Sequence, residues 1–305
     1  MSFDQQEHVL FDLLFDSHLR EQFCQNQTLA LTKYDLDKTE LNDFKTIRPE
    51  ALQLDAAMRA DLILSHICKS FPISFSITSS FPEGIDTLKQ LIDIETMRSK
   101  PIERATVFGN RLGQHYPGFA FSSDNERAIA TAILEAELGM SWTSASLKQL
   151  VLENGNVPQT TFEQGQDWLN EPIKLAAYVS ASVLPQSYTL IKQRLCKVED
   201  DCLWRHLNKK ALSVSVRKKT LQTEDPRLLI AKAYVCRASK CEPVIEHKTM
   251  ELSEGFAPLF QHVNGTMSVG QIIEQLKQIG AEQQMLQRIQ TVFQQLLETG
   301  MLEFQ

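Results

Sequence analysis

The sequence predicts a mainly α-helical protein with a small α+β part, and three observations support this fold class. Apolar residues recur at helical spacing through most of residues 1–200. Clean period-two alternation begins at Leu212. Capping and turn residues then mark short helices between Phe256 and Gly300. We therefore expect a helical domain over residues 1–200 and a winged-helix domain of three strands and three helices over residues 201–305.

Two helices are predicted near the N-terminus. Apolar residues between Val9 and Phe23 recur at intervals of three and four. Pro49 stands where the first turn of a helix tolerates proline, and that helix continues to about Phe71. The segment Ile73–Ile77 alternates like a strand, but a lone strand has no partner in a helical domain. We interpret it as a loop or a continuation of the helix.

The middle of the chain contains one marked helix. Ser123 and Glu126 have the spacing of a capping box, and the helix that follows is predicted over Arg127–Leu138, ending at Gly139. The polar segment Asn154–Pro172 is predicted to be a long loop.

The charge-dense segment Cys196–Lys210 follows a predicted helix near Ser187–Leu195, and it is interpreted as the connection between the two domains.

The second domain opens with three predicted strands, Leu212–Val216, Leu229–Cys236 and Val244–Met250. A first helix is predicted over Phe256–Val263, where Pro258 lies in the first turn.

A second helix is capped by Ser268 with Gln271 and ends at Gly280. A third helix covers residues 283–298, and Met301–Phe304 forms a closing strand.

The third of these helices is poor in charge, and Arg288 is its one basic residue. A helix that enters a DNA groove needs cations, because phosphate contacts supply most of the affinity. The module is therefore expected to hold a peptide and no nucleic acid. A peptide can add as a strand to Val244–Met250 if that strand lies at a sheet edge. Lys248, His247 and Arg288 could then meet acidic residues on the peptide, whereas the alternative is that Glu246 and Lys248 merely protect the edge.

A resemblance supports the peptide interpretation. The segment His262–Ile273 and the ending Leu296–Leu302 resemble the peptide-recognition element of ribosomal peptide-modifying systems. In that element a leader peptide adds to the third strand and packs against the third helix, which implicates twelve residues here. These predicted peptide-binding residues are Val244, Ile245, Glu246, His247, Lys248, Thr249, Met250, Gln284, Gln287, Arg288, Thr291 and Gln295.

The N-terminal segment Leu10–Phe23, together with the helix Arg59–Phe71, is similar to the helical domain of the methanobactin biosynthesis protein C family. Members of that family are non-catalytic partners of a multinuclear iron oxygenase, and the pair converts peptide cysteines to oxazolone and thioamide groups. The resemblance implies that iron resides in the partner enzyme and that this chain carries no cofactor. It assigns no catalytic residue.

Composition agrees with a partner protein of the cytoplasm. The chain has 31 basic and 38 acidic residues, a net charge of -7, which disfavours a general polyanion binder. No apolar run is long enough to cross a membrane and the first residues do not read as a secretory signal, so a cytoplasmic protein with reduced cysteines is expected.

No catalytic or metal motif stands out among the seven histidines and six cysteines. One cluster is a candidate zinc site, namely Glu246 and His247 with Cys236 and Cys241, but the spacing of these residues matches no recognised ligand pattern.

The sequence therefore predicts a subunit that binds a precursor peptide and presents its cysteines to an iron-dependent enzyme, with no catalytic and no metal-binding residue of its own. Two alternatives remain: a winged-helix transcription regulator with a helical ligand-sensing domain, and a stand-alone metalloenzyme.

Overall fold

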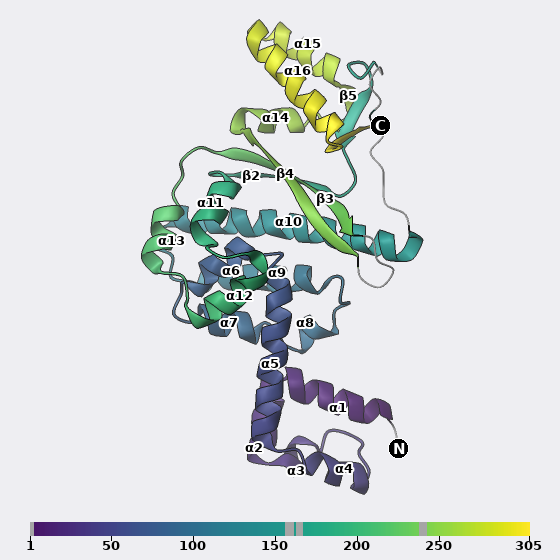
Figure 1. Ribbon diagram of the computed structural model, residues 1–305, viewed down its shortest axis with the longest axis vertical. Coiled ribbons are helices and arrows are strands. Elements are labelled where there is room, and N and C mark those ends of the chain that lie inside the picture. Colours follow the sequence, from purple (N-terminus) through teal and green to yellow (C-terminus); the bar gives the residue numbers. More distant parts are fainter. Residues whose placement is uncertain (1–2, 156–161, 163–166, 238–242) are drawn as a thin grey trace. The chain divides into compact units, whose positions relative to one another are not determined.

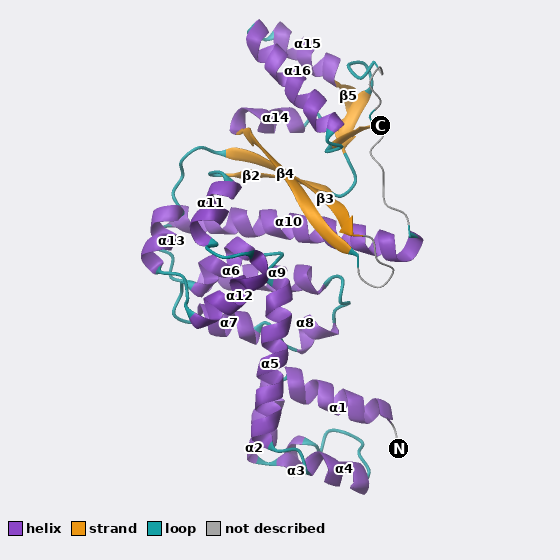
Figure 2. Ribbon diagram, viewed as in Figure 1, coloured by secondary structure: helices purple, strands orange, loops and turns teal. Residues whose placement is uncertain are grey.

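A computed structural model describes residues 3–155, 162, 167–237 and 243–305 of the protein. The chain forms two compact units (Figure 1). Unit 1 comprises Met1–Ala120 and Arg194–Arg217, and unit 2 comprises Phe121–Gln193 and Lys218–Gln305. The predicted boundary near residue 200 thus lies within the second segment of unit 1. The predicted mainly helical fold with a small α+β part is confirmed, because helices dominate and the strands form small antiparallel sheets (Figure 2).

Unit 1 is built from short helices around the longer helix α5. The helices of its first segment are α1 (Phe3–Phe15), α2 (Ser17–Gln25), α3 (Gln27–Ala30), α4 (Lys38–Lys45), α5 (Pro49–Ile67), α6 (Pro72–Ser79), α7 (Gly84–Gln90), α8 (Ile94–Arg98), α9 (Arg104–His115) and the 3-10 turn η1 (Tyr116–Gly118). Its second segment adds α12 (Asp200–Lys209) and the start of α13 (Val214–Thr220).

Helix α6 of unit 1 is buried along its whole length. The segment Ile73–Ile77, interpreted as a loop or helix continuation, lies within this separate helix. Its serines are tolerated because hydroxyl groups can donate to the preceding turn: Ser76 donates to the carbonyl of Pro72 at 2.9 Å. Phe75 packs against Phe108, with ring centroids 5.5 Å apart.

The interpretation of Cys196–Lys210 as a connection is wrong, because Asp200–Lys209 is helix α12 of unit 1. Leu203, Trp204 and Leu207 are buried on one face of that helix. The Trp204 ring lies 5.9 Å from that of Phe75, and its indole N–H donates to Asp61 at 3.3 Å. In the sequence, these apolar residues lie among charged ones, which are on the solvent side of the helix.

The predicted strand Leu212–Val216 is also wrong, because Val214–Thr220 is helix α13. The decisive side chain is Arg217, which is only 2% exposed. Its guanidinium donates to the hydroxyl of Ser80 at 2.7 Å and lies 3.9 Å from the centre of the Phe81 ring. This anchor lies outside the five-residue alternation that predicted a strand, so tertiary packing overrides a short local pattern.

Unit 2 contains all the strands found among the described residues. Its elements are α10 (Asp124–Asn154), β1 (Pro172–Leu175), β2 (Val179–Leu184), α11 (Tyr188–Leu195), which ends in unit 1, β3 (Arg227–Arg237), β4 (Val244–Ser253), the 3-10 turn η2 (Glu254–Phe256), α14 (Ala257–Phe260), β5 (Asn264–Ser268), α15 (Val269–Gln278), α16 (Gln283–Glu298) and β6 (Leu302–Phe304).

Helix α10 is much longer than the predicted Arg127–Leu138. Ser123 caps it as expected, accepting from the N–H of Glu126 at 3.1 Å. The helix does not stop at Gly139 but ends at Gly155, whose φ of 67° suits a glycine. A Cβ added at Gly139 would lie 3.2 Å from the Cβ of Ser180 on β2. The lack of a side chain at Gly139 therefore lets β2 approach the helix closely, and the glycine does not end the helix.

The strands form two three-stranded antiparallel sheets, with orders β2-β3-β4 and β5-β1-β6. The predicted second and third strands are confirmed as β3 and β4. The other neighbour of β3 is β2, which precedes the predicted first strand in the sequence. The closing strand is confirmed as β6 and pairs with β1. The predicted loop Asn154–Pro172 lies mostly outside the described residues.

The helical ending of the chain follows the predicted caps. Ser268 and Gln271 make both hydrogen bonds of a capping box at the start of α15. Gly280 and Gly300 follow α15 and α16 with φ values of 84° and 65°. The helix predicted over Phe256–Val263 is shorter in the structure. The 3-10 turn η2 leads into α14, which ends at Phe260, before β5 begins.

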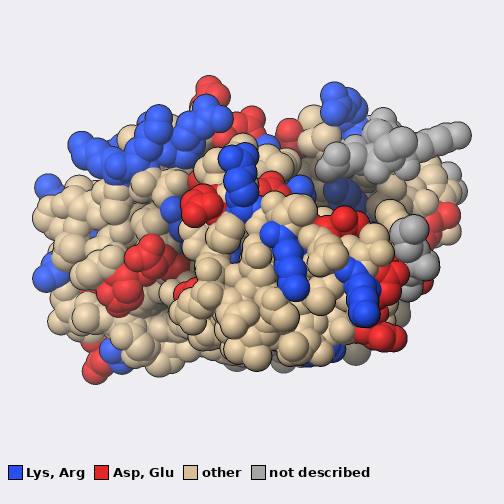
Figure 3. All heavy atoms as spheres, turned by 90° about the horizontal axis from the view of Figure 1, so that it is seen from below, with Lys and Arg blue, Asp and Glu red and all other residues tan. Residues whose placement is uncertain are grey.

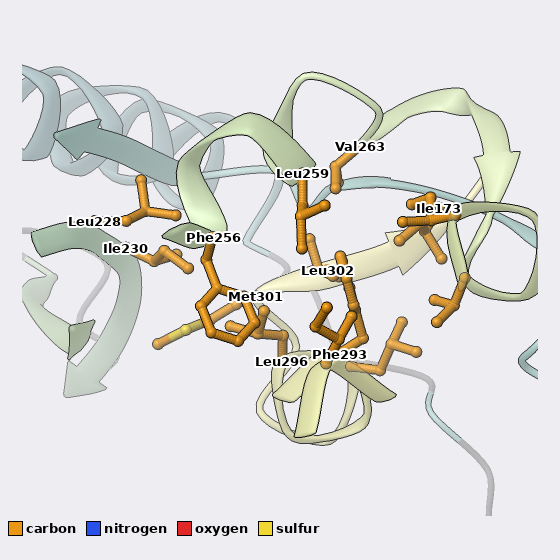
Figure 4. Packing of buried hydrophobic residues seen from close by; sticks show 14 residues of the cluster. Ile173, Leu228, Ile230, Phe256, Leu259, Val263, Phe293, Leu296, Met301 and Leu302 are labelled. Carbon is orange, nitrogen blue, oxygen red and sulfur yellow. The ribbon is translucent and has the colours of Figure 1, made fainter. Parts of the chain in front are cut away.

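One hydrophobic core joins these helices to both sheets (Figure 4). Leu228 and Ile230 enter it from β3, Phe256 and Leu259 from the segment after β4, and Phe293 and Leu296 from α16, as Figure 4 shows with Met301 and Leu302 beside them. Ile173 brings β1 into the same core.

We predict that Phe293→Ala lowers the free energy of unfolding of unit 2 by about 3–5 kcal/mol, because it empties a fully buried aromatic site. Chemical denaturation followed by circular dichroism measures the change. The neighbouring Gln294→Ala, on the exposed face of α16, is the matched control and should change stability by about 0.5 kcal/mol or less. Equal effects of the two substitutions would contradict this core.

Candidate peptide-binding edge

Strand β4 lies at the edge of its sheet. Within the described residues it pairs with β3 alone, in register from Arg227 opposite Ser253 to Val235 opposite Ile245. The second edge of β3 is occupied by β2. The outer side of β4 therefore presents main-chain groups without a strand partner, as strand addition requires.

The hydrogen-bonding pattern identifies which groups point outward. The N–H of Ala233 donates to the carbonyl of Tyr178 at 2.9 Å, on the β2 side. Because inward and outward residues alternate along an antiparallel strand, the even-numbered residues of β3 bond to β4. Their partners in β4 are Glu246, Lys248 and Met250. The main-chain groups that face outward thus belong to the odd-numbered residues, listed here: Ile245, His247, Thr249 and Glu251.

One face of β4 packs against α10. Ile245 joins a small core with Leu147 and Val151. The Nε2 atom of His247 lies 3.0 Å from the carbonyl oxygen of Met140, to which it donates, and 3.2 Å from the Ser144 hydroxyl. Burial lowers the pKa of the His247 imidazole, so the neutral form is favoured in the folded protein.

The opposite face of β4 changes character along the strand. Met250 and Leu252 pack against the main core of unit 2. Lys248 follows and is exposed, directly opposite Lys232 of β3. Glu246 is exposed too and accepts from the Tyr234 hydroxyl at 2.7 Å, which lowers the pKa of its carboxyl group.

The predicted residues of the third helix share one exposed face of α16. This set consists of Gln284, Gln287, Arg288, Thr291 and Gln295, all solvent-exposed. The opposite side of the helix buries Leu286, Ile289 and Phe293. A polar, nearly uncharged helix face is therefore present, as the sequence predicted.

The structure links the strand and the helix through the core and not by direct backbone packing. The main backbone neighbours of β4 are β3 and α10, whereas those of α16 are α15 and β6. The helix that lies behind β4 is α10, which supplies Met140, Thr143 and Ser144 around His247. Sequence reasoning missed these residues, because no local signal relates them to a strand one hundred residues later.

The side chains of the candidate zinc cluster do not converge on one site. Cys236 and Glu246 share the exposed face of the sheet, and the carboxylate raises the pKa of the Cys236 thiol. His247 points to the other face, toward α10. Cys241 lies outside the described residues. Across the part of the chain that the structure describes, no group of three or more His, Cys, Asp or Glu side chains could hold a metal ion.

A second polar cluster lies in unit 1 around the buried carboxylate of Asp12. It accepts from the Tyr34 hydroxyl at 2.7 Å and from Arg98 at 3.3 Å, and His8 lies 3.4 Å away. Burial and the hydrogen bond to Asp12 raise the pKa of Tyr34. The carboxylate is thus satisfied within unit 1, and the cluster ties α1 to α8.

No protein-family model, curated protein or solved structure matches this chain. Among the described residues, no helix is both long and apolar enough to pass through a membrane.

We predict that unit 2 loses stability as the pH falls below the usual pKa of histidine. The pKa of His247 is lower in the folded than in the unfolded protein, so its contribution is complete above that usual value and is lost on acidification. Urea unfolding at about pH 7.5 and about pH 5.5 measures the loss. His247→Gln, which keeps an N–H donor but does not titrate, should flatten this dependence. An unchanged slope would show that the residue is not buried as described.

Proposed function

We propose that this protein is a non-catalytic subunit that binds the leader of a ribosomally made precursor peptide. It would present the cysteines of that peptide to an iron-dependent oxidative enzyme, as in methanobactin-type biosynthesis. In this proposal the C-terminal three-helix part with its strands acts as a winged-helix peptide-recognition module. The chain itself needs no cofactor in this role, and the proposed place of action is the cytoplasm.

The observation that carries the proposal is the open edge of β4. Its outward main-chain groups, at Ile245, His247 and Thr249, alternate with residues that hold the strand to β3. The packing of His247 on α10 fixes the strand from behind. Because the strand is already ordered, the loss of conformational entropy on peptide binding is smaller.

The exposed face of α16 supports a peptide more than a nucleic acid. Arg288 is the one cation on this helix, whereas duplex binding needs several phosphate contacts. Figure 3 draws a different face, seen from below the view of Figure 1, on which basic side chains gather along one margin and acidic side chains lie among uncharged areas. The runner-up, a winged-helix transcription regulator, would instead shift promoter DNA in a gel at moderate salt.

The proposed docking surface for the enzyme is an exposed apolar stripe on α5 of unit 1. Leu54, Met58 and Leu62 are 62%, 64% and 62% exposed, although each is a large apolar residue. Their spacing of four residues places them in one stripe along the helix. Exposed apolar stripes of this kind mark protein interaction sites, so we assign the stripe to the partner subunit.

We predict that Thr249→Pro weakens binding of the leader peptide about tenfold or more, because it removes an outward N–H and places a ring at the edge. Calorimetry with the full-length protein measures the affinity. Thr249→Val keeps the N–H and is the matched control, which should bind normally. Unchanged affinity of the proline variant would refute strand addition, and peptide turnover by the isolated protein would refute the subunit role.

We also predict that Met58→Glu reduces association with the partner enzyme about tenfold or more, because a charge in an apolar contact loses its hydration. Co-purification with the product of a neighbouring oxygenase-like gene tests this. Gln53→Glu introduces the same charge elsewhere on α5 and should leave association intact. Equal retention of the partner by both variants would remove α5 from the interface, and peptide binding should be normal in each.

A further inference from the structure

We infer that the strand captured by β4 carries an acidic residue beside Lys248 and an apolar residue beside Met250, two positions away on the same face. The inference rests on the proposed capture of a peptide by the β4 edge and specifies the class of peptide that fits there.

The register of the sheet places these residues on one face. Side chains alternate between the faces of a strand, so Glu246, Lys248 and Met250 share the face turned away from α10. Their partners across the ladder are Tyr234, Lys232 and Ile230. A strand added on the open side of β4 would place its own residues beside the same three side chains.

The residue of the added strand that lies beside Lys248 is expected to be negatively charged. Lys232 and Lys248 lie directly opposite each other, and like charges in this arrangement destabilise a sheet. Glu303 of β6 forms an ion pair with Lys174 at 3.5 Å, and its charge also favours the protonated form of Lys232. Lys248 makes no ion pair with any described residue. Burial lowers the pKa of Lys232, so the protonated form of this lysine is already disfavoured and a further cation beside it would be destabilising. An incoming carboxylate would flank Lys248 on its open side.

The two flanking positions have different requirements. Met250 is half-buried at the margin of the main core, so an apolar neighbour would extend that core. Glu246 already accepts from Tyr234, so the position beside it needs no cation. The resulting pattern along one face is apolar, then acidic, with one residue between them.

Selection from a display library of random strand-length peptides on the full-length protein tests the inference. Peptides that bind in a manner sensitive to Thr249→Pro should be enriched in an acidic residue two positions from an apolar one. For these peptides, Lys248→Glu should weaken binding about two- to tenfold. A second selection, on the Lys248→Glu variant, should enrich Lys or Arg at the position where the first enriched an acidic residue. Lys219→Glu, an exposed change on α13, is the charge-matched control and should alter neither.

The outcomes separate the two levels of the proposal. Proline-sensitive peptides without an acidic preference, or with one that Lys248→Glu leaves unchanged, would overturn the inferred pattern and leave strand capture standing. A selection that yields no proline-sensitive peptide would overturn both.

Discussion

The arrangement of unit 2 depends on the double pairing of β3. This strand is hydrogen-bonded to β2 on one side and to β4 on the other. Ala233 packs toward α10, whereas Leu228 and Ile230 enter the core with α16. Because β3 is fixed on both edges and both faces, it dictates which main-chain groups of β4 remain for a partner.

The same constraint explains how a partly polar strand can be held at an edge. His247 anchors β4 to the carbonyl of Met140, and Met250 anchors it to the core on the opposite face. Lys248 lies between these anchors with its side chain in solvent. Edge charges also prevent unwanted strand pairing, so one lysine can disfavour most strands while favouring an acidic one.

Two buried charged side chains of unit 1, Arg217 and Asp12, have their partners within that unit, whereas a set of its apolar residues is exposed. Arg217 is paired with Ser80 and stacked on Phe81, and Asp12 is paired with Tyr34 and Arg98. The stripe on α5 has no such internal role. The proposed division of labour therefore assigns peptide capture to unit 2 and enzyme docking to unit 1.

The sequence by itself determined the elements whose signals are local: the capped helices α15 and α16, the strands β3 and β4, and the low charge of α16. Capping hydrogen bonds and alternation act within a few residues. Only the tertiary structure decided that Gly139 continues a helix and that residues 212–216 do not form a strand. It also decided that β2 pairs with the other side of β3 and that α10 packs against one face of the candidate strand. Those outcomes depend on Ser180, Ser80 and Met140, partners that are distant in the sequence, and distant contacts leave no periodic trace in the segment that they stabilise.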